Sequence, residues 1–418
     1  MDFLNLVIYI SVYIGLVATS FYALSYFSGS KKEKPLYADN ELPTVSVLIP
    51  MYNEEKSIKR TLESVLSSEY PKGKMEIIVI DNNSKDNSLK IAKKFTGIHN
   101  NIKVRVLQEK TQGKGYALNK GIRESKSQIV LSMDADTFIE PHSLKEMMRF
   151  FKNPQVMCVS PAMVIEKPRT ILQRIQQAEY LFGLFLRKAF SSINAVHITP
   201  GAFSAYRRSF FEKHGYYDEH NITEDLELAL RIQSKGYIIE NCPESPAYTI
   251  APHKFRALLV QRRRWYTGLM RNTWSYRRMI LNPEYGDLGM FVMPIAWISI
   301  FFAVFVLLST VFRTLIQIKD ELVFLSNVNF DFKNVFDLNL YIIERFFFLL
   351  FSNPIIIFII FFIAILGVYL KYATKKVGRV SGLKITLPLF FLLFSILFAF
   401  WWIISIIYVA FNRKVKWR

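Results

Sequence analysis

Hydrophobic residues are spread unevenly along this chain of 418 residues. Four stretches are long and almost free of charge: 4–26, 288–316, 343–370 and 385–411. Each is near or above the roughly 20 residues that a helix needs to cross a bilayer. The first has neither a basic segment before it nor a small-residue cleavage site after it, so it reads as a retained anchor. The pattern predicts an integral membrane protein with about three further spans.

Between the first and second stretches, residues from about 40 to 285 alternate strand-like and helix-like patterns. Strands are predicted at four places: 45–50, 75–81, 103–108 and 129–133. The first helix is predicted to open at Asn53-Glu54-Glu55, with Asn53 as its N-cap, and to end near Ser67. Strands separated by single helices favour a mostly parallel sheet with right-handed crossovers. The predicted fold class of this part is therefore α/β.

The strand at 129–133 leads directly into Asp134-Ala135-Asp136. In an open α/β sheet, ligands bind beyond the carboxyl ends of the strands. Two carboxylates this close repel each other unless a cation lies between them, and hard oxygen ligands suit Mg²⁺ or Mn²⁺ that also holds phosphate oxygens and water. The pair predicts a site for a metal-bound diphosphate, although an isolated Asp-x-Asp can also be only an acidic turn.

Two other polar segments should reach the same edge of the sheet. Asp81, in the turn Asp81-Asn82-Asn83-Ser84, ends the second predicted strand, and Lys114 lies between two glycines before a helix. Asp81 could bind the base or ribose of a nucleotide, or could serve only as a turn former. Lys114 could supply charge to a phosphate that the glycine backbone approaches, or could be a solvated loop lysine.

The second half of the soluble part adds two more candidates. In Thr223-Glu224-Asp225, a carboxylate at a helix start could be a general base or could only balance the helix dipole. In the amphipathic stretch 255–280, an amide, a fork-shaped cation and an aromatic face fall within about one turn: Gln261, Arg264 and Trp265. These suit a sugar hydroxyl, a phosphate and a sugar ring. A basic-aromatic helix can also be simply interfacial.

The charge and the cysteines refine this interpretation. Lys and Arg number 53 against 34 Asp and Glu, a formal net charge of +19. Basic residues gather beside the apolar stretches, as in Arg277-Arg278 and Lys375-Lys376, so membrane lipids and not nucleic acid are the expected partners. The two cysteines, Cys158 and Cys242, predict neither a disulfide framework nor a cysteine metal site and fit a reducing compartment.

The topology is predicted from the charges beside the spans. The N-terminus carries Asp2 and no basic residue, whereas the basic cluster 31–34 follows the first span. Because basic loops favour the cytoplasm, the soluble domain should be cytoplasmic. The acidic loop 317–342 suits the outside and the basic loop 371–384 the inside. The basic tail from Arg413 breaks the rule, so either it is an exception or one C-terminal segment is not a simple span.

Five motifs follow one another in order: Pro50-Met51-Tyr52-Asn53-Glu54, Asp81-Asn82-Asn83-Ser84, Asp134-Ala135-Asp136, Thr223-Glu224-Asp225 and Gln261-Arg262-Arg263-Arg264-Trp265. Together they resemble the membrane-embedded, processive family 2 glycosyltransferases, which include chitin-oligosaccharide, poly-N-acetylglucosamine, hyaluronan and cellulose synthases. The motifs cover roughly residues 43–285, and the last one narrows the resemblance to the processive-like branch. None of them identifies the sugar.

The resemblance implies a GT-A type nucleotide-sugar-binding domain with a mostly parallel central sheet, plus a helical transmembrane region. In such a domain the nucleotide-binding aspartate falls on Asp81, with Tyr52 and Glu54 beside the base and ribose. The metal site falls on Asp134 and Asp136, the second of which would ligate Mg²⁺ or Mn²⁺ bridging the diphosphate. The donor implied is a UDP-sugar, with UDP-N-acetylglucosamine or UDP-glucose favoured.

The resemblance also implies which residues act in catalysis and at the acceptor site. The catalytic base falls on Asp225, next to Glu224, and the chemistry is one inverting displacement that gives a β-glycosidic bond. Lys114 and Arg264 would stabilise the departing UDP, while Gln261 and Trp265 belong to the element that shapes the acceptor site. A segment at 171–190 is similar to the interfacial helix that supports the acceptor channel; its polar residues are Gln173, Gln176, Gln177 and Tyr180.

The predicted organisation is an N-terminal transmembrane helix at 1–30, a catalytic domain at 40–285 with interfacial helices at about 168–190 and 255–281, and a transmembrane region at 286–418. The expected location is the cell (plasma) membrane. No PilZ-like extension and no Phe-x-Val-Thr gating loop is found, and the spans are fewer than in a cellulose synthase, so chitin-oligosaccharide synthases are the most similar. Two alternatives stay open: a glycolipid synthase of the ceramide-glucosyltransferase kind, which adds one sugar to a lipid acceptor, and an inactive membrane scaffold.

Overall fold

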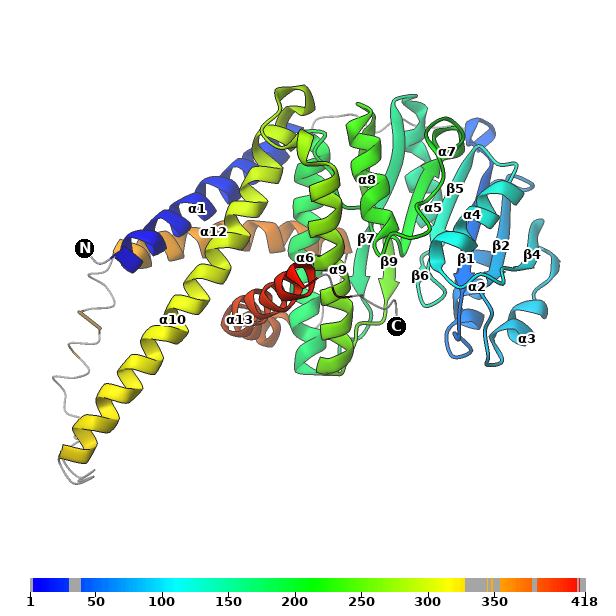
Figure 1. Ribbon diagram of the computed structural model, residues 1–418. Coiled ribbons are helices and arrows are strands. Elements are labelled where there is room, and N and C mark those ends of the chain that lie inside the picture. The colour runs from blue at the N-terminus through cyan, green and yellow to red at the C-terminus, as the bar shows by residue number, and fades with distance from the viewer. Residues whose placement is uncertain are drawn as a thin grey trace.

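The computed structural model describes most of the chain: residues 3–29, 39–327, 344, 347–348, 354–377, 382–411 and 413. Figure 1 shows a sheet domain at one end and long helices that extend away from it at the other. Four charged segments used for the predicted topology lie wholly or partly outside the described residues: the cluster 31–34, the loops 317–342 and 371–384, and the tail after Arg413. The orientation in a membrane therefore stays a prediction.

Within the described residues, nine strands form one sheet in the order β3-β4-β2-β1-β5-β8-β7-β9-β6. Their bounds are Val45–Met51 (β1), Met75–Asp81 (β2), Gly97–His99 (β3), Ile102–Gln108 (β4), Ile129–Met133 (β5), Phe138–Ile139 (β6), Val156–Ile165 (β7), Phe203–Arg207 (β8) and Ile238–Thr249 (β9). The four predicted strands are β1, β2, β4 and β5, and they are parallel to one another. The whole sheet is mixed, because β3, β6 and β8 pair antiparallel with their neighbours.

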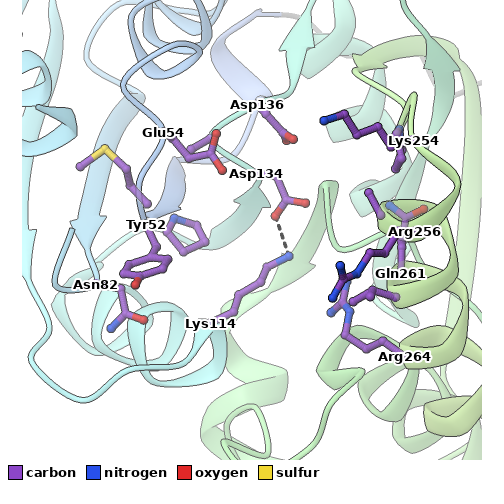
Figure 2. A pocket seen from close by; sticks show the side chains of 16 residues that line it. Tyr52, Glu54, Asn82, Lys114, Asp134, Asp136, Lys254, Arg256, Gln261 and Arg264 are labelled. Atoms are coloured by element: carbon purple, nitrogen blue, oxygen red, sulfur yellow. Dashed lines mark ion pairs between the residues drawn. The ribbon is translucent and has the colours of Figure 1, made fainter. Parts of the chain in front are cut away.

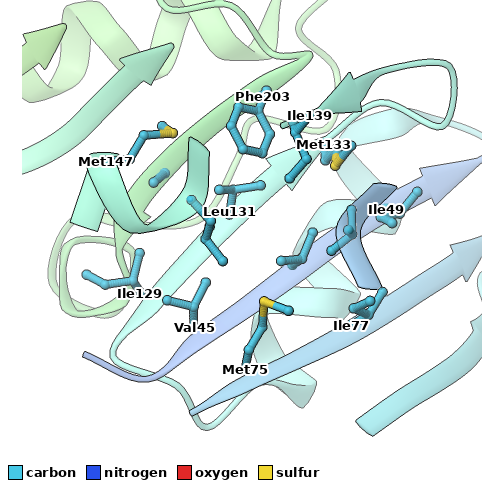
Figure 3. Close-up of a cluster of buried hydrophobic side chains, with 14 of the residues drawn as sticks. Val45, Ile49, Met75, Ile77, Ile129, Leu131, Met133, Ile139, Met147 and Phe203 are labelled. Atoms are coloured by element: carbon cyan, nitrogen blue, oxygen red, sulfur yellow. The ribbon is translucent and has the colours of Figure 1, made fainter. Parts of the chain in front are cut away.

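Alternate residues of the parallel strands pack on opposite faces of the sheet, because successive side chains of a strand point to opposite sides. Val45, Val47 and Ile49 of β1 belong to one buried cluster, part of which is drawn in Figure 3. Leu48 belongs to a second cluster with Ile78 of β2. Both faces are apolar, as parallel strands covered on both sides require.

Helices cover both faces. The first cluster includes residues of α2 (Ile58–Leu66), α3 (Ser88–Lys93) and α5 (Ser143–Met148). The second includes residues of α4 (Lys114–Glu124), α7 (Arg208–His214) and α8 (Glu224–Ser234). Short 3₁₀ turns lie at Asp39–Glu41, Arg149–Lys152, Arg277–Met279 and Pro283–Tyr285, and a π-helical turn at Leu288–Val292 precedes α10.

Four helices among the described residues are long and apolar enough to span a membrane: Phe3–Phe27, Leu288–Asn327, Ile356–Lys376 and Leu383–Ala410. They contain α1 (Phe3–Gly29), α10 (Met293–Asn327), α12 (Pro354–Val377) and α13 (Leu383–Ala410) wholly or in large part. Two further helices, α6 (Ile171–Ser192) and α9 (Phe255–Ser275), lie between the sheet and these spans (Figure 1). Helix α6 packs on β7 and β9 and also on α1, α12 and α13.

One predicted helix start is wrong. Helix α2 begins at Ile58, and Asn53 has a left-handed φ of 55°. The turn after β2 holds this segment instead: Asn53 Oδ1 accepts a hydrogen bond from the backbone N of Lys85 at 2.8 Å, and the backbone N of Glu54 donates to Ser88 Oγ at 2.7 Å. A side chain that bonds another loop in this way does not cap a helix.

The predicted loop at 317–342 is also partly wrong. Helix α10 continues to Asn327, so the first part of that segment is helical. Its remaining part, 328–342, lies outside the described residues. In contrast, the predicted amphipathic segments at 171–190 and 255–280 correspond closely to α6 and to α9 with its following 3₁₀ turn.

Candidate active site

The carboxyl ends of three strands place the predicted residues at one edge of the sheet. Strand β1 pairs in parallel with both β2 and β5. Tyr52 and Glu54 follow β1, Asp81 ends β2, and Asp134 and Asp136 follow β5. These five residues therefore gather at the edge where ligands bind in open α/β sheets.

A cavity of about 660 Å³ opens at this edge. One wall carries carboxylates from the loops after β1 and β5: Glu54, Asp134 and Asp136. The facing wall comes from α9 and the residues just before it: Lys254, Arg256, Gln261 and Arg264. Figure 2 shows the two walls, with Lys114 between them. A cavity of this size, with one acidic and one cationic wall, can hold a ligand that carries both a metal ion and anionic groups.

Lys114 connects the acidic wall to the start of α8. Its Nζ lies 2.6 Å from Oδ1 of Asp134, 3.2 Å from the carbonyl O of Gly201 and 3.6 Å from Oε1 of Glu224. Its side chain is only 8% exposed. Burial alone would lower the pKa of Lys114, but Asp134, Glu224 and Asp225 together raise it above its usual value. The ammonium group is therefore held charged between two sets of carboxylates.

Glu224 and Asp225 occupy different environments at the start of α8. Glu224 is buried, which raises its pKa; Lys114 opposes this shift and Asp225 adds to it. Asp225 is half-buried, and its Oδ2 accepts a hydrogen bond from the backbone N of Gly201 at 2.8 Å while its Oδ1 accepts one from Leu226 at 2.9 Å. Neither carboxylate lines the cavity itself. Asp225 is thus fixed in orientation next to Lys114.

The turn that contains Gly201 requires a glycine. A Cβ added at Gly201 would lie 2.7 Å from Oδ2 of Asp225 and 3.1 Å from Nζ of Lys114. The next residue, Ala202, accepts a hydrogen bond from the backbone N of Asp134 at 2.9 Å. The turn at 199–203 therefore joins the carboxylate after β5 to the carboxylate of α8.

Asp81 ends β2 just outside the lining of the cavity, and Asn82 follows it. Asp81 is buried, and no described residue hydrogen-bonds to its Oδ1. Asn82 lines the cavity; its Oδ1 accepts a hydrogen bond from the backbone N of Gly113 at 2.7 Å and its Nδ2 donates to the carbonyl O of Thr111 at 2.7 Å. Asn82 thereby fixes the loop that carries Lys114.

Helix α9 is held close to the start of α8. Arg264 Nη1 donates to the carbonyl O of Ile222 at 3.3 Å, and Asn272 Nδ2 donates to Oγ1 of Thr223 at 3.0 Å. A side chain at Gly268 would collide with Thr223, so glycine permits this approach. The contacts place the cationic wall of the cavity beside Glu224 and Asp225.

The structure thus gathers most predicted residues around one cavity and adds others. The candidates that line it are Tyr52, Glu54, Lys114, Asp134, Asp136, Gln261 and Arg264. Asp81, Glu224, Asp225 and Trp265 lie outside the lining. Lys254 and Arg256 line it without having been predicted, although their position just before Gln261 was a signal that could have found them.

This fold is that of the GT-A-like glycosyltransferases, as predicted. A mannosyltransferase from Pyrobaculum calidifontis, solved in complex with GDP-Man and Mn²⁺, aligns with 70% of this chain and 86% of its own at a TM-score of 0.53 and 22% sequence identity. At this identity the likeness concerns the fold.

Residues 46–215 match the model of glycosyl transferase family 2. Poly-beta-1,6-N-acetyl-D-glucosamine synthase of Staphylococcus aureus (strain COL) is 29% identical over 311 residues, which cover 72% of this chain and 74% of that protein. The enzyme of the same name from Staphylococcus epidermidis is 33% identical over 238 residues, covering 55% and 57%. Residues 46–215 therefore form a glycosyl transferase family 2 domain, and the resemblance to family 2 found in the motifs is confirmed.

Proposed function

We propose that this enzyme transfers a sugar from a UDP-sugar to a growing β-linked oligosaccharide or polysaccharide at the membrane, with inversion at the anomeric carbon. The observation that carries the proposal is the cavity at the carboxyl edge of the sheet, in which Asp134 and Asp136 face the cationic wall of α9. UDP-N-acetylglucosamine is the favoured donor, because the similar staphylococcal proteins are named for a polymer of N-acetyl-D-glucosamine.

The residues at the cavity fit a nucleotide diphosphate. Just outside the lining, Oδ1 of Asp81 accepts no hydrogen bond from a described residue and suits an N–H of the base, while Tyr52 and Glu54 line the cavity nearby. Lys114 supplies a charge that stays in place at neutral pH, because its pKa is raised. Arg264 on the facing wall can bind phosphate oxygens through its planar fork.

The donor set also fits a divalent metal, Mg²⁺ or Mn²⁺. Asp134 and Asp136 offer hard oxygen atoms at the cavity wall, and among the described residues no third acidic, histidine or cysteine side chain completes a metal cluster with them. Two carboxylates plus phosphate oxygens and water form the coordination that Mg²⁺ prefers. When bound, the metal neutralises the diphosphate and makes it a better leaving group.

Asp225 is proposed as the general base. It takes the proton of an acceptor hydroxyl, whose oxygen forms a bond to the anomeric carbon as the bond from that carbon to the diphosphate breaks. The backbone N of Gly201 orients the carboxylate, and a base must lie within hydrogen-bond reach of the proton it accepts. Lys114 and Arg264 stabilise the charge on the departing UDP. Gln261 and Trp265 are assigned to the acceptor side.

We further place the catalytic domain on the cytoplasmic side of the plasma membrane, with 1–30 and 286–418 as transmembrane regions and α6 and α9 as interfacial helices. Support comes from the four helices long enough to span a bilayer and from the position of α6 and α9 between them and the sheet. A lipid acceptor is the second candidate, because α9 packs directly on the apolar helix α13.

The test uses the purified full-length protein in lipid nanodiscs with Mn²⁺ and one donor at a time: UDP-N-acetylglucosamine, UDP-glucose, UDP-glucuronate or UDP-galactose. UDP release and product mass are read together. Masses spaced by one sugar, formed without an added lipid acceptor, support a polymer or oligomer synthase and name its donor. A product that requires lipid and gains one sugar makes the protein a glycolipid synthase. Absence of UDP release with every donor contradicts the proposal.

A further inference from the structure

Helix α9 presents two different faces. Its Gln261 and Arg264 line the cavity. Its intervening residues Arg262 and Arg263, and Tyr266 one residue beyond Trp265, contact other helices instead. The helix that forms the cationic wall is therefore the same helix that meets the last membrane span.

Arg262 makes the most buried of these contacts. It is 1% exposed, and its two terminal nitrogens donate to the two carboxylate oxygens of Glu179 on α6 at 2.8 and 2.7 Å. Its guanidinium carbon also lies 4.4 Å from the ring centre of Trp265 and 5.5 Å from that of Trp401 on α13. A planar guanidinium can bind a carboxylate with both arms and contact rings at the same time, which an ammonium cannot do.

Two further contacts, made by residues close to Arg262, join α9 to α13. The ring of Tyr266 stacks on that of Trp402, with centres 4.5 Å apart and planes inclined by 5°. Arg263 Nη1 donates to the hydroxyl of Tyr408 at 2.8 Å. Trp401 and Trp402 are both buried, so the seam between the two helices is closed.

The position of Arg262 also restricts Trp265. Because the guanidinium covers one face of the indole, only the opposite face is available to a sugar ring. A shift of Arg262 would turn the indole and move Gln261 and Arg264, which lie within one turn of it on a rigid helix.

We propose that Arg262 is a positioning residue. Arg262 is held by Glu179 and lies between Trp265 and Trp401, so it fixes the position of α9 against the last membrane helix. This position in turn places Gln261, Arg264 and Trp265 for catalysis. The inference rests on the proposed function, since it assumes that these three side chains act on the acceptor and the leaving diphosphate. It assigns the two residues Glu179 and Arg262 a role that is separate from binding the nucleotide.

Two variants of the full-length protein in nanodiscs test this role: Arg262→Lys keeps the charge and loses the fork, and Glu179→Asp shortens the partner by one methylene. Each should lower kcat by about tenfold or more, because small misplacements of catalytic groups are costly, while UDP affinity with Mn²⁺ changes by no more than about twofold. Amide hydrogen exchange in α9 should become faster, whereas exchange in α4 should not change.

Arg105→Lys is the matched control, since Arg105 pairs with Glu76 on the far side of the sheet and should leave kcat, UDP affinity and exchange in α9 unchanged. Wild-type kcat in both variants, or unchanged exchange in α9, overturns the inference. So does a loss of UDP affinity equal to the loss of kcat. If Arg262→Lys fails to fold, the kcat, UDP affinity and α9 exchange of Glu179→Asp test the positioning role instead. A wild-type protein that releases no UDP contradicts the proposed function. Exchange in α9 then still tests whether Arg262 fixes the position of α9 against α13.

Discussion

Lys114 is surrounded by carboxylates and connects the acidic wall of the cavity to the start of α8. It contacts Asp134 after β5 and Glu224 at the start of α8. Its place in the sequence, between two glycines, indicated an anion-binding lysine but not this second partner. Contacts of this kind depend on the turn at Gly201, whose tight fit against Asp225 has no signature in the sequence.

The carboxylate of Asp225 gives the first prediction. Asp225→Asn should keep UDP binding, because the residue does not line the cavity, and should lower transfer by about 10²- to 10⁴-fold, the usual contribution of a general base. Isothermal titration with UDP and a transfer assay on the same preparation measure the two effects. Asp218→Asn, at an exposed aspartate on the loop before α8, is the control and should change neither. Retained turnover in Asp225→Asn removes Asp225 from the role of base.

The proposed metal ligand Asp136 gives the second prediction. Asp136→Ala should abolish the Mn²⁺-dependent part of UDP binding, because one of two hard oxygen ligands is lost from the cavity wall. Titrations of UDP with and without Mn²⁺ measure this part directly. Asp39→Ala, at a surface aspartate paired with Lys145, should bind UDP as the wild type does. An unchanged metal dependence in Asp136→Ala excludes it as a ligand.

The parallel strands β1, β2, β4 and β5 could be predicted: β1, β2 and β5 are short, mostly apolar runs, and β4 alternates apolar and polar residues. The long strands β7 and β9 could not, because they contain Pro161, Pro243 and Pro246, residues that argue against a central strand. The register between them shifts at Pro161, which shows how the sheet accommodates the proline. The start of α2 was missed because Asn53 bonds a turn that is distant in sequence.

Helix α2 is tied to the end of β7 by an ion pair that gives the third prediction. Arg60 donates two hydrogen bonds to Glu166, which lowers the pKa of that carboxyl, and it also lies over Phe138. A lowered folded-state pKa contributes stability above the unfolded pKa that is lost as pH falls through the folded value. Arg60→Gln should therefore lower the melting temperature near pH 7, and this deficit should shrink below about pH 4.5.

The expected deficit is small. Arg60 is half-exposed, so solvent screening limits the pair to about 1 kcal/mol or less, or roughly 2–4 °C. Scanning fluorimetry from pH 3.5 to 7.5 measures it. Lys59→Gln removes only a looser pair with Glu63 at 3.8 Å, in which both side chains are exposed, and should give a smaller deficit. A deficit in Arg60→Gln that grows toward acid pH contradicts the assignment.

The sheet domain and the helices that are apolar enough to span a membrane are joined by specific contacts and not only by chain connections. Lys376 of α12 pairs with Glu244 of β9 at 2.6 Å, and α9 and α6 both pack on α13. The apolar stretches predicted the spans from length and composition alone. Their packing against α6 and α9 could not be predicted, because it depends on aromatic and basic residues that also suit an interfacial helix.

In the proposed reaction, the cavity binds a UDP-sugar whose anomeric carbon is attacked once, from the side opposite the diphosphate. The most direct measurement is the anomeric configuration of the product that the full-length protein forms in nanodiscs from α-linked UDP-N-acetylglucosamine labelled with ¹³C at C1. Proton-detected NMR should show a β-linked sugar, as one displacement assisted by Asp225 requires. An α-linked product would contradict the single displacement and the role of Asp225 in it.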